Sequence, residues 1–458
     1  MDISYAGQKV LIIGAGISGF AAAKVLKKLG AEVVLSDAKA EADIKYDFTE
    51  LREAGIELVF GPQADSLLDG VDIVLASPAV PVRVPIIQTA LQRGLRLMSE
   101  IELAYILARS PFCAVTGTNG KTTTVTLLGL LLEAQFDRVG VGGNIGVPLV
   151  DEALRVGAGG AVAAEISSYQ LEATSLFHPH VAAILNVTPD HIVRHGSMEV
   201  YQATKEKIFA QQTAADAVVL NYDDERTRGM AERARRNTRV CFFSRRTELA
   251  EGATLVGDRL TLRWEGQEHP LCTVDELGIK GGHNVENALA AAAVAFLAGV
   301  EPERMIPVLK SFQGVEHRIE YVRTIDDVPY YNDSKATNTD SAIKALETFP
   351  DHIILIAGGD DKLTDLTDFM TLVKERVDEL ILLGDAAERF AQAALDMGIG
   401  ADRIYKVGYD MNAAVAKAHE LAHKPQVVLL SPACASFDMY DGFEERGRDF
   451  KRIVNELK

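Results

Sequence analysis

Short apolar runs that end in glycine or aspartate alternate along the chain with longer stretches rich in alanine and leucine. The apolar runs predict strands at 9–13, 31–36, 111–115, 182–187 and 353–357, and the longer stretches predict helices at 20–29, 125–132, 200–211 and 288–296. Strands that alternate with helices are typical of parallel sheets joined by crossover helices. The pattern therefore predicts an α/β fold throughout.

Three of the predicted strands run directly into glycine-containing turns, at 14–19, 116–120 and 358–359. Each transition resembles the start of a phosphate-binding loop, so we expect three α/β modules, each built around a mostly parallel sheet. The chain has 458 residues, which agrees with three domains at about 150 residues each. We place them at 1–99, 100–314 and 315–458.

The charge balance limits the possible partners. The chain has 47 Lys+Arg and 65 Asp+Glu, a formal net charge of −18, and this argues against nucleic acid and anionic membranes as general partners. The longest uncharged run, 288–300, is shorter than the roughly 20 residues that span a bilayer. The four cysteines form no Cys-x-x-Cys pair, so we expect no disulfide and no structural zinc. The N-terminus shows no signal peptide, so we expect a cytoplasmic protein. We also expect a monomer.

The first glycine turn contains a dinucleotide-binding pattern. Gly14, Gly16 and Gly19 follow the first strand, and Asp37 ends the second. Glycines let the backbone approach a pyrophosphate at a helix N-terminus, and the acid can accept a sugar hydroxyl. NAD and a UDP-sugar satisfy this pattern equally, and a glycine turn used only for packing is the alternative.

The second glycine turn predicts a triphosphate site. Residues 116–123 read Thr-Gly-Thr-Asn-Gly-Lys-Thr-Thr, with Val115 where the full phosphate-loop consensus has its first glycine. Backbone amides and Lys121 would cradle the phosphates of ATP, and the Thr122 hydroxyl would bind Mg²⁺. A dehydrogenase would explain the first motif but leaves Lys121 without a role. Two nucleotide motifs therefore indicate two nucleotide-containing substrates.

Three further polar groups follow in the central third. Glu165 and Asp190-His191 come just after apolar strands, at the sheet edge where ligands and Mg²⁺ bind. The spacing of Lys205 favours a solvated lysine on a helix, and nothing in that spacing alone overturns this interpretation. Asn284 and Asn287 precede a helix and could cap it or reach the adenine or the phosphates.

Four polar loops cluster in the C-terminal third, at 316–318, 332–338, 358–362 and 431–437. Surface loops would explain any one of them. Their combined density of Lys, Arg, Asp and Ser beside apolar strands predicts a site for a small charged substrate and for the γ-phosphate.

Taken together, these segments resemble the Mur ligases, the ATP-dependent amide-forming enzymes of peptidoglycan precursor synthesis. The Gly-Thr-Asn-Gly-Lys-Thr-Thr run is shared by the whole family. The runs at 165–172, 332–338 and 431–438 look specific to its D-glutamate-adding branch. The resemblance covers the whole chain and implies a Rossmann-like N-terminal domain, a central P-loop ATPase-like domain and a Rossmann-like C-terminal domain.

The resemblance also implies a role for each matching position. UDP would be bound by Gly16, Ile17, Ser18, Gly19, Asp37, Ser77 and Asn144. ATP would be bound by Gly117, Thr118, Asn119, Gly120, Lys121, Thr122, Thr123, Asn284, Asn287, Arg318 and Asp333. Mg²⁺ would be held by Thr122, Glu165, His191 and a carbamylated Lys205. D-glutamate would be bound by Lys335, Thr337, Lys362, Ser436, Phe437 and Phe443. Lys121, His191, Lys205 and Arg318 would be catalytic.

The implied activity is the ATP-dependent addition of D-glutamate to UDP-N-acetylmuramoyl-L-alanine through an acyl phosphate and a tetrahedral intermediate. Val193 and Pro189 depart from residues common in relatives, at positions close to the proposed metal ligands. A sibling ligase that adds another amino acid is the alternative within the family. From a different class, a non-catalytic protein that binds a UDP-sugar or nucleotide would leave the Mg²⁺ and phosphate residues idle.

Overall fold

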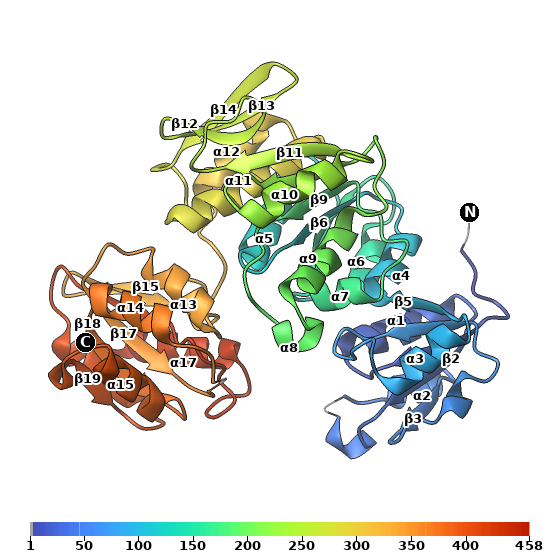
Figure 1. Ribbon diagram of the computed structural model, residues 1–458, viewed down its shortest axis with the longest axis horizontal. Helices are drawn as coiled ribbons and strands as arrows, with labels where there is room; N and C mark the ends of the chain where they lie inside the picture. Colours follow the sequence, from blue (N-terminus) through green and yellow to red (C-terminus); the bar gives the residue numbers. More distant parts are fainter. Residues whose placement is uncertain (1–2, 45, 362, 458) are drawn as a thin grey trace. The chain divides into compact units, whose positions relative to one another are not determined.

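The computed structural model describes residues 3–44, 46–361 and 363–457. It contains three sheets, each flanked by helices (Figure 1). This arrangement confirms the predicted α/β class and the prediction of three mostly parallel sheets.

The N-terminal sheet has the strand order β3-β2-β1-β4-β5, and all of its neighbouring strands are parallel. Its strands are β1 (Lys9–Ile13), β2 (Glu32–Asp37), β3 (Glu57–Phe60), β4 (Ile73–Ala76) and β5 (Arg96–Ser99). Its helices are α1 (Ile17–Lys28), η1 (Glu41–Asp43), α2 (Thr49–Glu53), η2 (Asp65–Leu68) and α3 (Pro85–Gln92). The carboxyl ends of β1 and β4 thus lie side by side, which is where a ligand of such a sheet binds.

The central sheet has nine strands in the order β14-β13-β12-β11-β10-β9-β6-β8-β7. They are β6 (Phe112–Thr116), β7 (Val139–Gly143), β8 (Ala161–Glu165), β9 (Val181–Ile184), β10 (Ala217–Asn221), β11 (Arg239–Ser244), β12 (Gly252–Val256), β13 (Arg259–Trp264) and β14 (Gln267–Thr273). Neighbouring strands are parallel along the part of the sheet that contains β12, β11, β10, β9, β6, β8 and β7. At the other end, β13 pairs antiparallel with β12 and with β14.

Helices surround this central sheet. They are α4 (Glu100–Leu107), α5 (Lys121–Glu133), α6 (Leu149–Val156), α7 (Ser168–Glu172), α8 (Ile192–His195), α9 (Met198–Glu206), η3 (Lys207–Phe209), α10 (Glu225–Ala234), α11 (Gly282–Leu297) and α12 (Pro302–Ser311). The strands β6, β8 and β9 are buried along their whole length, as expected for strands covered on both faces.

The C-terminal sheet has the order β15-β16-β20-β17-β18-β19 and is parallel except for the β15–β16 pair. Its strands are β15 (Glu320–Ile325), β16 (Val328–Asn332), β17 (Ile353–Gly358), β18 (Val377–Leu383), β19 (Ile404–Lys406) and β20 (Val427–Leu430). Its helices are α13 (Thr339–Leu346), α14 (Thr367–Arg376), α15 (Ala387–Asp396), η4 (Ala401–Arg403), α16 (Met411–Leu421) and α17 (Phe443–Glu456).

The chain divides into two compact units. One comprises Met1–Leu277 and Glu286–Ser311 and holds the first two sheets, and the other comprises Gly278–Val285 and Phe312–Lys458 and holds the third. The short segment 278–285, which includes the first turn of α11, therefore belongs to the same unit as the C-terminal sheet. The rest of α11 belongs to the unit of the central sheet.

Several helices begin earlier than the sequence predicts. Helix α1 begins at Ile17 and not at Phe20, so the last part of the glycine motif forms its first turn. At Gly19 a Cβ would lie 2.1 Å from the carbonyl oxygen of Gly14, so only glycine allows this close turn. Helix α11 begins at Gly282. The alternative in which Asn284 or Asn287 is its N-cap is therefore wrong, because both lie inside the helix.

The cores are formed by the apolar strand residues and the helix faces that cover them. All four cysteines are buried as free thiols, which confirms that they act as small apolar side chains. Among the described residues, no helix is both long enough and apolar enough to cross a bilayer.

Candidate active site

The phosphate-loop motif forms the turn between β6 and α5. Gly117 has φ 154° and Gly120 has φ 85°, conformations that side chains other than glycine rarely adopt. Helix α5 begins directly after Gly120, at Lys121. The N-terminus of α5 and the positive end of its dipole therefore lie at the loop, which suits a phosphate.

Asn186, just beyond β9, fixes the shape of this loop. Its Oδ1 atom accepts the backbone N–H groups of Thr118 at 3.0 Å and Asn119 at 2.8 Å, and its amide donates to the carbonyl of Asn119 at 3.2 Å. The Thr118 hydroxyl lies 3.2 Å from the hydroxyl of the buried Tyr201. The loop is thus held by side chains from two other segments before any ligand binds.

Two lysines converge on one carbonyl of the loop. Lys121 Nζ donates to the carbonyl oxygens of Gly117 at 2.9 Å and Thr118 at 2.7 Å, and Lys205 Nζ donates to the same Gly117 oxygen at 2.9 Å. Lys205 is 1% exposed, so the alternative of a solvated helix lysine is wrong. The two amino groups therefore lie close together at the phosphate loop.

The Lys205 ammonium is poorly accommodated in its charged form. Burial lowers the pKa of Lys205 well below its ordinary value, and the neighbouring charge of Lys121 lowers it further, while Asp190 opposes the shift. The Nζ atom also lies 4.5 Å from the ring centroid of Tyr201. These surroundings favour the neutral amine over the ammonium, and a neutral amine is a nucleophile.

Glu165 ends β8 next to the loop and has an oxygen that could accept a cation. Its Oε1 atom accepts the side-chain amide of Asn144 at 2.8 Å. Its Oε2 atom is buried without a hydrogen-bond partner among the described residues, as are the hydroxyls of Thr116, Thr123 and Thr188. Unsatisfied buried oxygens of this kind suit Mg²⁺, which prefers oxygen ligands.

His191 lies on the same side of the sheet, at the start of α8. Its backbone is left-handed, with φ 54°, which is uncommon for a residue other than glycine. The Tyr169 hydroxyl lies 2.9 Å from His191 Nδ1, and Asp190 Oδ2 lies 3.3 Å from Nε2. The imidazole is thus oriented by a tyrosine that the sequence reasoning did not single out.

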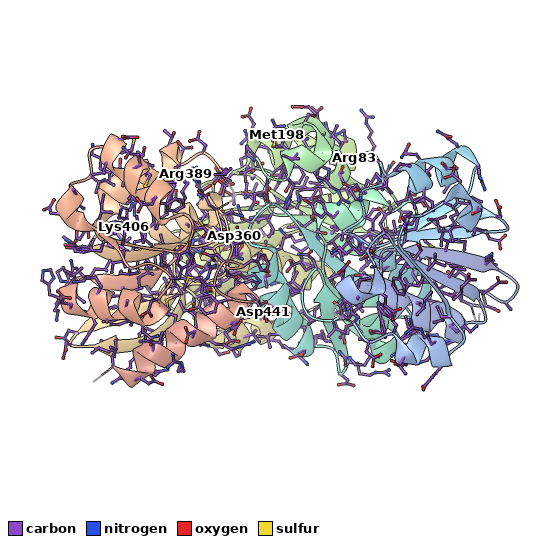
Figure 2. All side chains as sticks on the ribbon, turned by 90° about the horizontal axis from the view of Figure 1, so that it is seen from below. Arg83, Met198, Asp360, Arg389, Lys406 and Asp441 are labelled. Atoms are coloured by element: carbon purple, nitrogen blue, oxygen red, sulfur yellow. The ribbon has the colours of Figure 1, made fainter. Side chains whose placement is uncertain are left out.

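Arg194 links this group to the N-terminal sheet. It forms an ion pair with Glu172 at 2.7 Å, and its guanidinium carbon lies 4.2 Å from the ring centroid of Tyr169. It also donates to the carbonyl oxygens of residues 78, 79 and 80, at 3.1–3.3 Å. In return Arg83, labelled in Figure 2, donates to the carbonyl of Arg194 at 3.1 Å. Two arginines therefore join the loop after β4 to the His191 segment.

The N-terminal glycine turn brings together the residues expected to bind UDP there. Asp37 Oδ2 accepts the backbone N–H of Ala15 at 2.8 Å, so this carboxylate also braces the turn. Ser77 packs so closely that a Cβ on Gly14 would lie 2.6 Å from its Cβ atom. Ile17 is half exposed at the start of α1. Ser18 and Gly19 lie in the first turn of that helix, and Gly16 is its N-cap.

The remaining central residues lie as follows. Asn144 contacts Glu165 through both its side chain and its backbone N–H, which places it with the proposed metal group. Asn287 packs on the phosphate loop, because a Cβ on Gly120 would lie 2.4 Å from its Oδ1 atom. Asn284 donates to the carbonyl of Lys280, in the segment that belongs to the C-terminal unit.

In the C-terminal unit, Asp333 follows β16 and is almost fully buried. Its oxygens accept the Ser431 hydroxyl at 2.7 Å and the backbone N–H of Ile319 at 3.2 Å. Burial raises the pKa of Asp333 to about 7, and the hydrogen bond from Ser431 and the charge of Arg318 oppose this rise. Asp333 and Arg318 are thus electrostatically coupled, as a shared site requires.

The residues expected to bind D-glutamate lie in loops of this unit. Lys335 Nζ is 5.5 Å from the ring centroid of Phe443, at the start of α17. Thr337 follows in the same loop as Lys335, with its backbone N–H bonded to the Lys335 carbonyl. Ser436 is buried and Phe437 is 71% exposed in the loop after β20. Lys362 lies outside the described residues.

His317, in the polar segment 316–318, contacts the end of β16. It is buried, and its Nδ1 atom lies 2.9 Å from the Asn332 amide. Glu316, His317 and Glu320 could together hold a cation. However, the ammonium of Lys451 already lies 2.6 Å from Glu316 Oε1 and 2.9 Å from Glu320 Oε1.

Sequence reasoning missed Asn186, Tyr169, Tyr201, Arg194 and Arg446. A signal existed for Arg446, which stands four residues before Phe450 and seven before Ile453 and therefore on the buried stripe of α17. The structure shows it 2% exposed. For Asn186 no local signal existed, because its partners precede it by 67 and 68 residues.

Comparison with known protein families matches each of the three sheets to a domain. Residues 8–99 match the model of the Mur ligase MurD-like N-terminal domain, residues 115–295 that of the Mur ligase middle domain, and residues 317–434 that of the Mur ligase glutamate ligase domain. These three matches follow the three sheets in order.

Two curated relatives match over nearly their full length, and both are named UDP-N-acetylmuramoylalanine–D-glutamate ligase. The one from Pelotomaculum thermopropionicum is 46% identical over 451 residues, covering 98% of each chain. The one from Caldanaerobacter subterraneus subsp. tengcongensis is 42% identical over 451 residues, covering 98% of this chain and 99% of the relative.

Solved structures show the same fold at lower identity. A pseudomurein peptide ligase type C from Methanothermus fervidus superposes with a TM-score of 0.60 at 19% identity, covering 99% of this chain and 100% of that one. UDP-N-acetylmuramate-alanine ligase from Thermotoga maritima gives 0.57 at 20% identity, covering 98% and 100%. With three domain models matched in order and relatives 42–46% identical, the chain belongs to the Mur ligase family, the ATP-dependent ligases of peptidoglycan precursor synthesis.

Proposed function

We propose that this ligase joins D-glutamate to UDP-N-acetylmuramoyl-L-alanine through an acyl phosphate, with the phosphate loop and Lys205 at the centre of the chemistry. The activity, UDP-N-acetylmuramoylalanine–D-glutamate ligase, is the one for which its full-length relatives are named. The observation that carries the proposed chemistry is the convergence of Lys121 and Lys205 on the carbonyl of Gly117.

ATP binds at the phosphate loop. The backbone N–H groups of the loop and the N-terminus of α5 hold the phosphates, and Lys121 turns from the loop carbonyls to the β- and γ-phosphates. Asn287, which packs on Gly120, contacts the nucleotide from the side. By family resemblance, Asn284, Arg318 and Asp333 also bind ATP.

In the first step, an oxygen of the L-alanyl carboxylate attacks the γ-phosphorus of ATP. The bond between that phosphorus and the bridging oxygen breaks, ADP leaves with the electron pair, and an acyl phosphate forms. Two anions must meet for this reaction, so the positive charge of Lys121 and Arg318 lowers the barrier by neutralising them.

Glu165, His191, Thr122 and a carbamylated Lys205 would hold Mg²⁺, which when bound neutralises phosphate and carboxylate oxygens. The unsatisfied Glu165 oxygen supports this assignment. Tyr169 and Arg194 orient His191 within that group.

The carbamate follows from the chemistry of Lys205. Its neutral amine attacks the carbon of CO₂, an N–C bond forms, and one proton is released to solvent. The product is an anion, so an ammonium that burial and Lys121 disfavour is exchanged for a negative group that attracts Lys121 and Mg²⁺. The burial of Lys205 beside a second cation supports this modification.

In the second step, the amine of D-glutamate attacks the acyl carbon. A tetrahedral intermediate forms, the C–O bond to phosphate breaks, and the amine loses a proton as the amide forms. Lys335, Thr337, Lys362, Ser436, Phe437 and Phe443 bind D-glutamate in this proposal, and the N-terminal turn with Gly16, Ile17, Ser18, Gly19, Asp37, Ser77 and Asn144 binds the UDP moiety. The enzyme works as a cytoplasmic monomer.

A phosphate-release assay tests the substrate assignment. Purified protein is given UDP-N-acetylmuramoyl-L-alanine, ATP and Mg²⁺ with D-glutamate, L-glutamate, L-alanine or a diamino acid. Of these amino acids, only D-glutamate is expected to cause phosphate release. Release with another of these amino acids in place of D-glutamate would assign the chain to a sibling activity, and folded protein that binds UDP-sugar without release would support the non-catalytic alternative.

An oxygen-transfer experiment tests the acyl phosphate. The L-alanyl carboxylate is labelled with ¹⁸O, and the inorganic phosphate is analysed by mass spectrometry. One labelled oxygen per phosphate is expected, because the carboxylate oxygen that attacked phosphorus leaves with it. Unlabelled phosphate would overturn the proposed first step.

A further inference from the structure

One buried side chain in the C-terminal unit contacts four separate segments. Arg446, in the first turn of α17, donates from Nε to the Ser334 hydroxyl at 3.0 Å and from Nη2 to the Ser334 carbonyl at 2.9 Å. It also donates to the carbonyl oxygens of Cys434 at 3.1 Å and Ala435 at 2.9 Å. The guanidinium thus joins the loop after β16, the loop after β20 and its own helix.

The fourth segment is the glycine turn after β17. At Gly359 a Cβ would lie 3.0 Å from Arg446 Nη1 and 2.4 Å from the Ala435 carbonyl oxygen. The next residue, Asp360, labelled in Figure 2, donates its backbone N–H to Ala435 at 3.1 Å. Only a glycine allows the turn to approach the guanidinium this closely.

Ser334 closes the network. Its hydroxyl accepts from Arg446 Nε and donates to the carbonyl of Phe443 at 2.8 Å. The start of α17 is therefore tied to the Ser334 loop twice, once through this hydroxyl and once through the arginine. Lys335, the next residue in that loop, lies over the Phe443 ring.

All four hydrogen-bond acceptors of Arg446 are uncharged. Burial lowers the pKa of Arg446 to about 10, so the group remains charged at neutral pH. Burying a charge is costly unless its donors are satisfied, and the planar fork of a guanidinium can satisfy several acceptors in fixed directions where an ammonium cannot. The site requires arginine for its geometry as well as for its charge.

We propose that Arg446 is a positioning residue for the incoming amino acid. The segments that it joins carry the described residues assigned to D-glutamate under the proposed function, on which this inference rests: Lys335, Thr337, Ser436, Phe437 and Phe443. Because those residues must contact two carboxylates and an amine at fixed spacing, their relative placement sets both the affinity for glutamate and the preference for the D enantiomer.

Arg446→Lys tests this role, since it keeps the charge and loses the fork. The Michaelis constant for D-glutamate should rise by about 10- to 100-fold, as expected for a displaced binding group. The constants for ATP and the UDP-substrate should stay within about threefold, and the ratio of D- to L-glutamate turnover should fall. Arg446→Met, which also removes the charge, should show the larger effect.

Arg403→Lys is the matched control. Arg403 belongs to the same unit and also donates to backbone carbonyls, those of Val377 and Asp378, at the amino end of β18. Its replacement should lower the thermal midpoint without changing the D-glutamate constant. If Arg446→Lys alters only the thermal midpoint, as the control does, Arg446 is merely structural and the proposal is wrong.

A milder variant covers the case in which Arg446→Lys does not fold. Ser334→Ala removes the bridging hydroxyl and leaves the guanidinium in place, and a selective rise of about threefold or more in the D-glutamate constant is expected. An unchanged constant, or equal rises for all three substrates, would overturn the proposal. Wild-type protein that releases no phosphate with D-glutamate would instead refute the function itself.

Discussion

Lys205 and Arg446 are two cations buried to the same degree in different surroundings. They are 1% and 2% exposed. Lys205 Nζ donates one hydrogen bond among those found in the described residues, to Gly117, and has a second ammonium beside it. Arg446 donates four, to acceptors on two loops.

The pKa shifts of the two groups have the same first cause and different further causes. Burial acts first on both groups, but it lowers the pKa of Lys205 well below its ordinary value and that of Arg446 only to about 10. Burial alone therefore does not decide what a cation does. The nearby cation Lys121 lowers the pKa of Lys205 further, which favours the reactive neutral amine, whereas Arg446 stays charged and its four hydrogen bonds hold the structure.

The largest effect is expected from removing the reactive amine. In Lys205→Arg the side chain cannot be carbamylated and remains a cation beside Lys121, so kcat should fall by about 10³-fold, as for loss of a principal electrostatic contact. Steady-state phosphate release measures this. Lys207→Arg, two residues further on, is the control and should retain most of the activity. A Lys205→Arg enzyme with wild-type kcat would contradict the carbamate assignment.

A smaller loss is expected at Arg194, whose guanidinium resembles that of Arg446 in having its donors satisfied. Arg194→Ala removes the ion pair to Glu172 and the contacts to residues 78–80. We expect a loss of about 10- to 100-fold in kcat/KM for the UDP-substrate, as for partners that orient a metal ligand. Arg226→Ala, at an exposed position of helix α10, should leave kcat/KM unchanged, and equal losses in both variants would refute a specific role.

The local parts of this arrangement can be predicted from the sequence. The strand at 9–13 has the predicted bounds, and the phosphate loop forms where its glycines stand, because eight consecutive residues encode both the turn and the amides that line it. Two helices begin earlier than predicted, at Ile17 and at Gly282. Glycines favour turns in a sequence, and both helices begin within glycine-containing segments.

The tertiary part cannot be predicted in this way. Ser334 lies 112 residues before Arg446, and no local pattern around either residue predicts their contact. Lys205 looks like a solvated helix residue, since its burial depends on Tyr201 and on a loop 88 residues away. For these residues the physical reason lies in packing between distant segments. The family resemblance implied a role for Lys205 but none for Ser334 or Arg446.

The smallest expected effect concerns stability. It arises from a buried carboxyl group with one oxygen that accepts no hydrogen bond. Glu100 is buried, and its Oε1 atom accepts the backbone N–H of Val150 at 2.7 Å, while its Oε2 atom has no partner among the described residues. Burial raises the pKa of Glu100 from 4.5 to about 7. The folded protein therefore keeps a proton that the unfolded chain loses, so stability falls as the pH rises from 4.5 to 7.

Glu100→Gln removes this dependence. Relative to wild type, the free energy of unfolding of the variant should rise by up to about 1.4 kcal/mol per pH unit between pH 5 and 7 and then level off. Denaturant unfolding at four pH values measures the difference. The exposed Glu133→Gln is the control, and a difference that does not change with pH would show that Glu100 ionises normally.

The comparison of the two cations is tested most directly at Lys205 itself. Protein equilibrated with ¹³C-bicarbonate is examined by ¹³C NMR for a carbamate carbon. Wild type and Lys207→Gln should show the signal, and Lys205→Gln should lack it, while Arg446→Lys should keep it because that site lies in another unit. A spectrum without the carbamate in wild type, or with it unchanged in Lys205→Gln, would contradict the view that Lys205 is the reactive member of the pair.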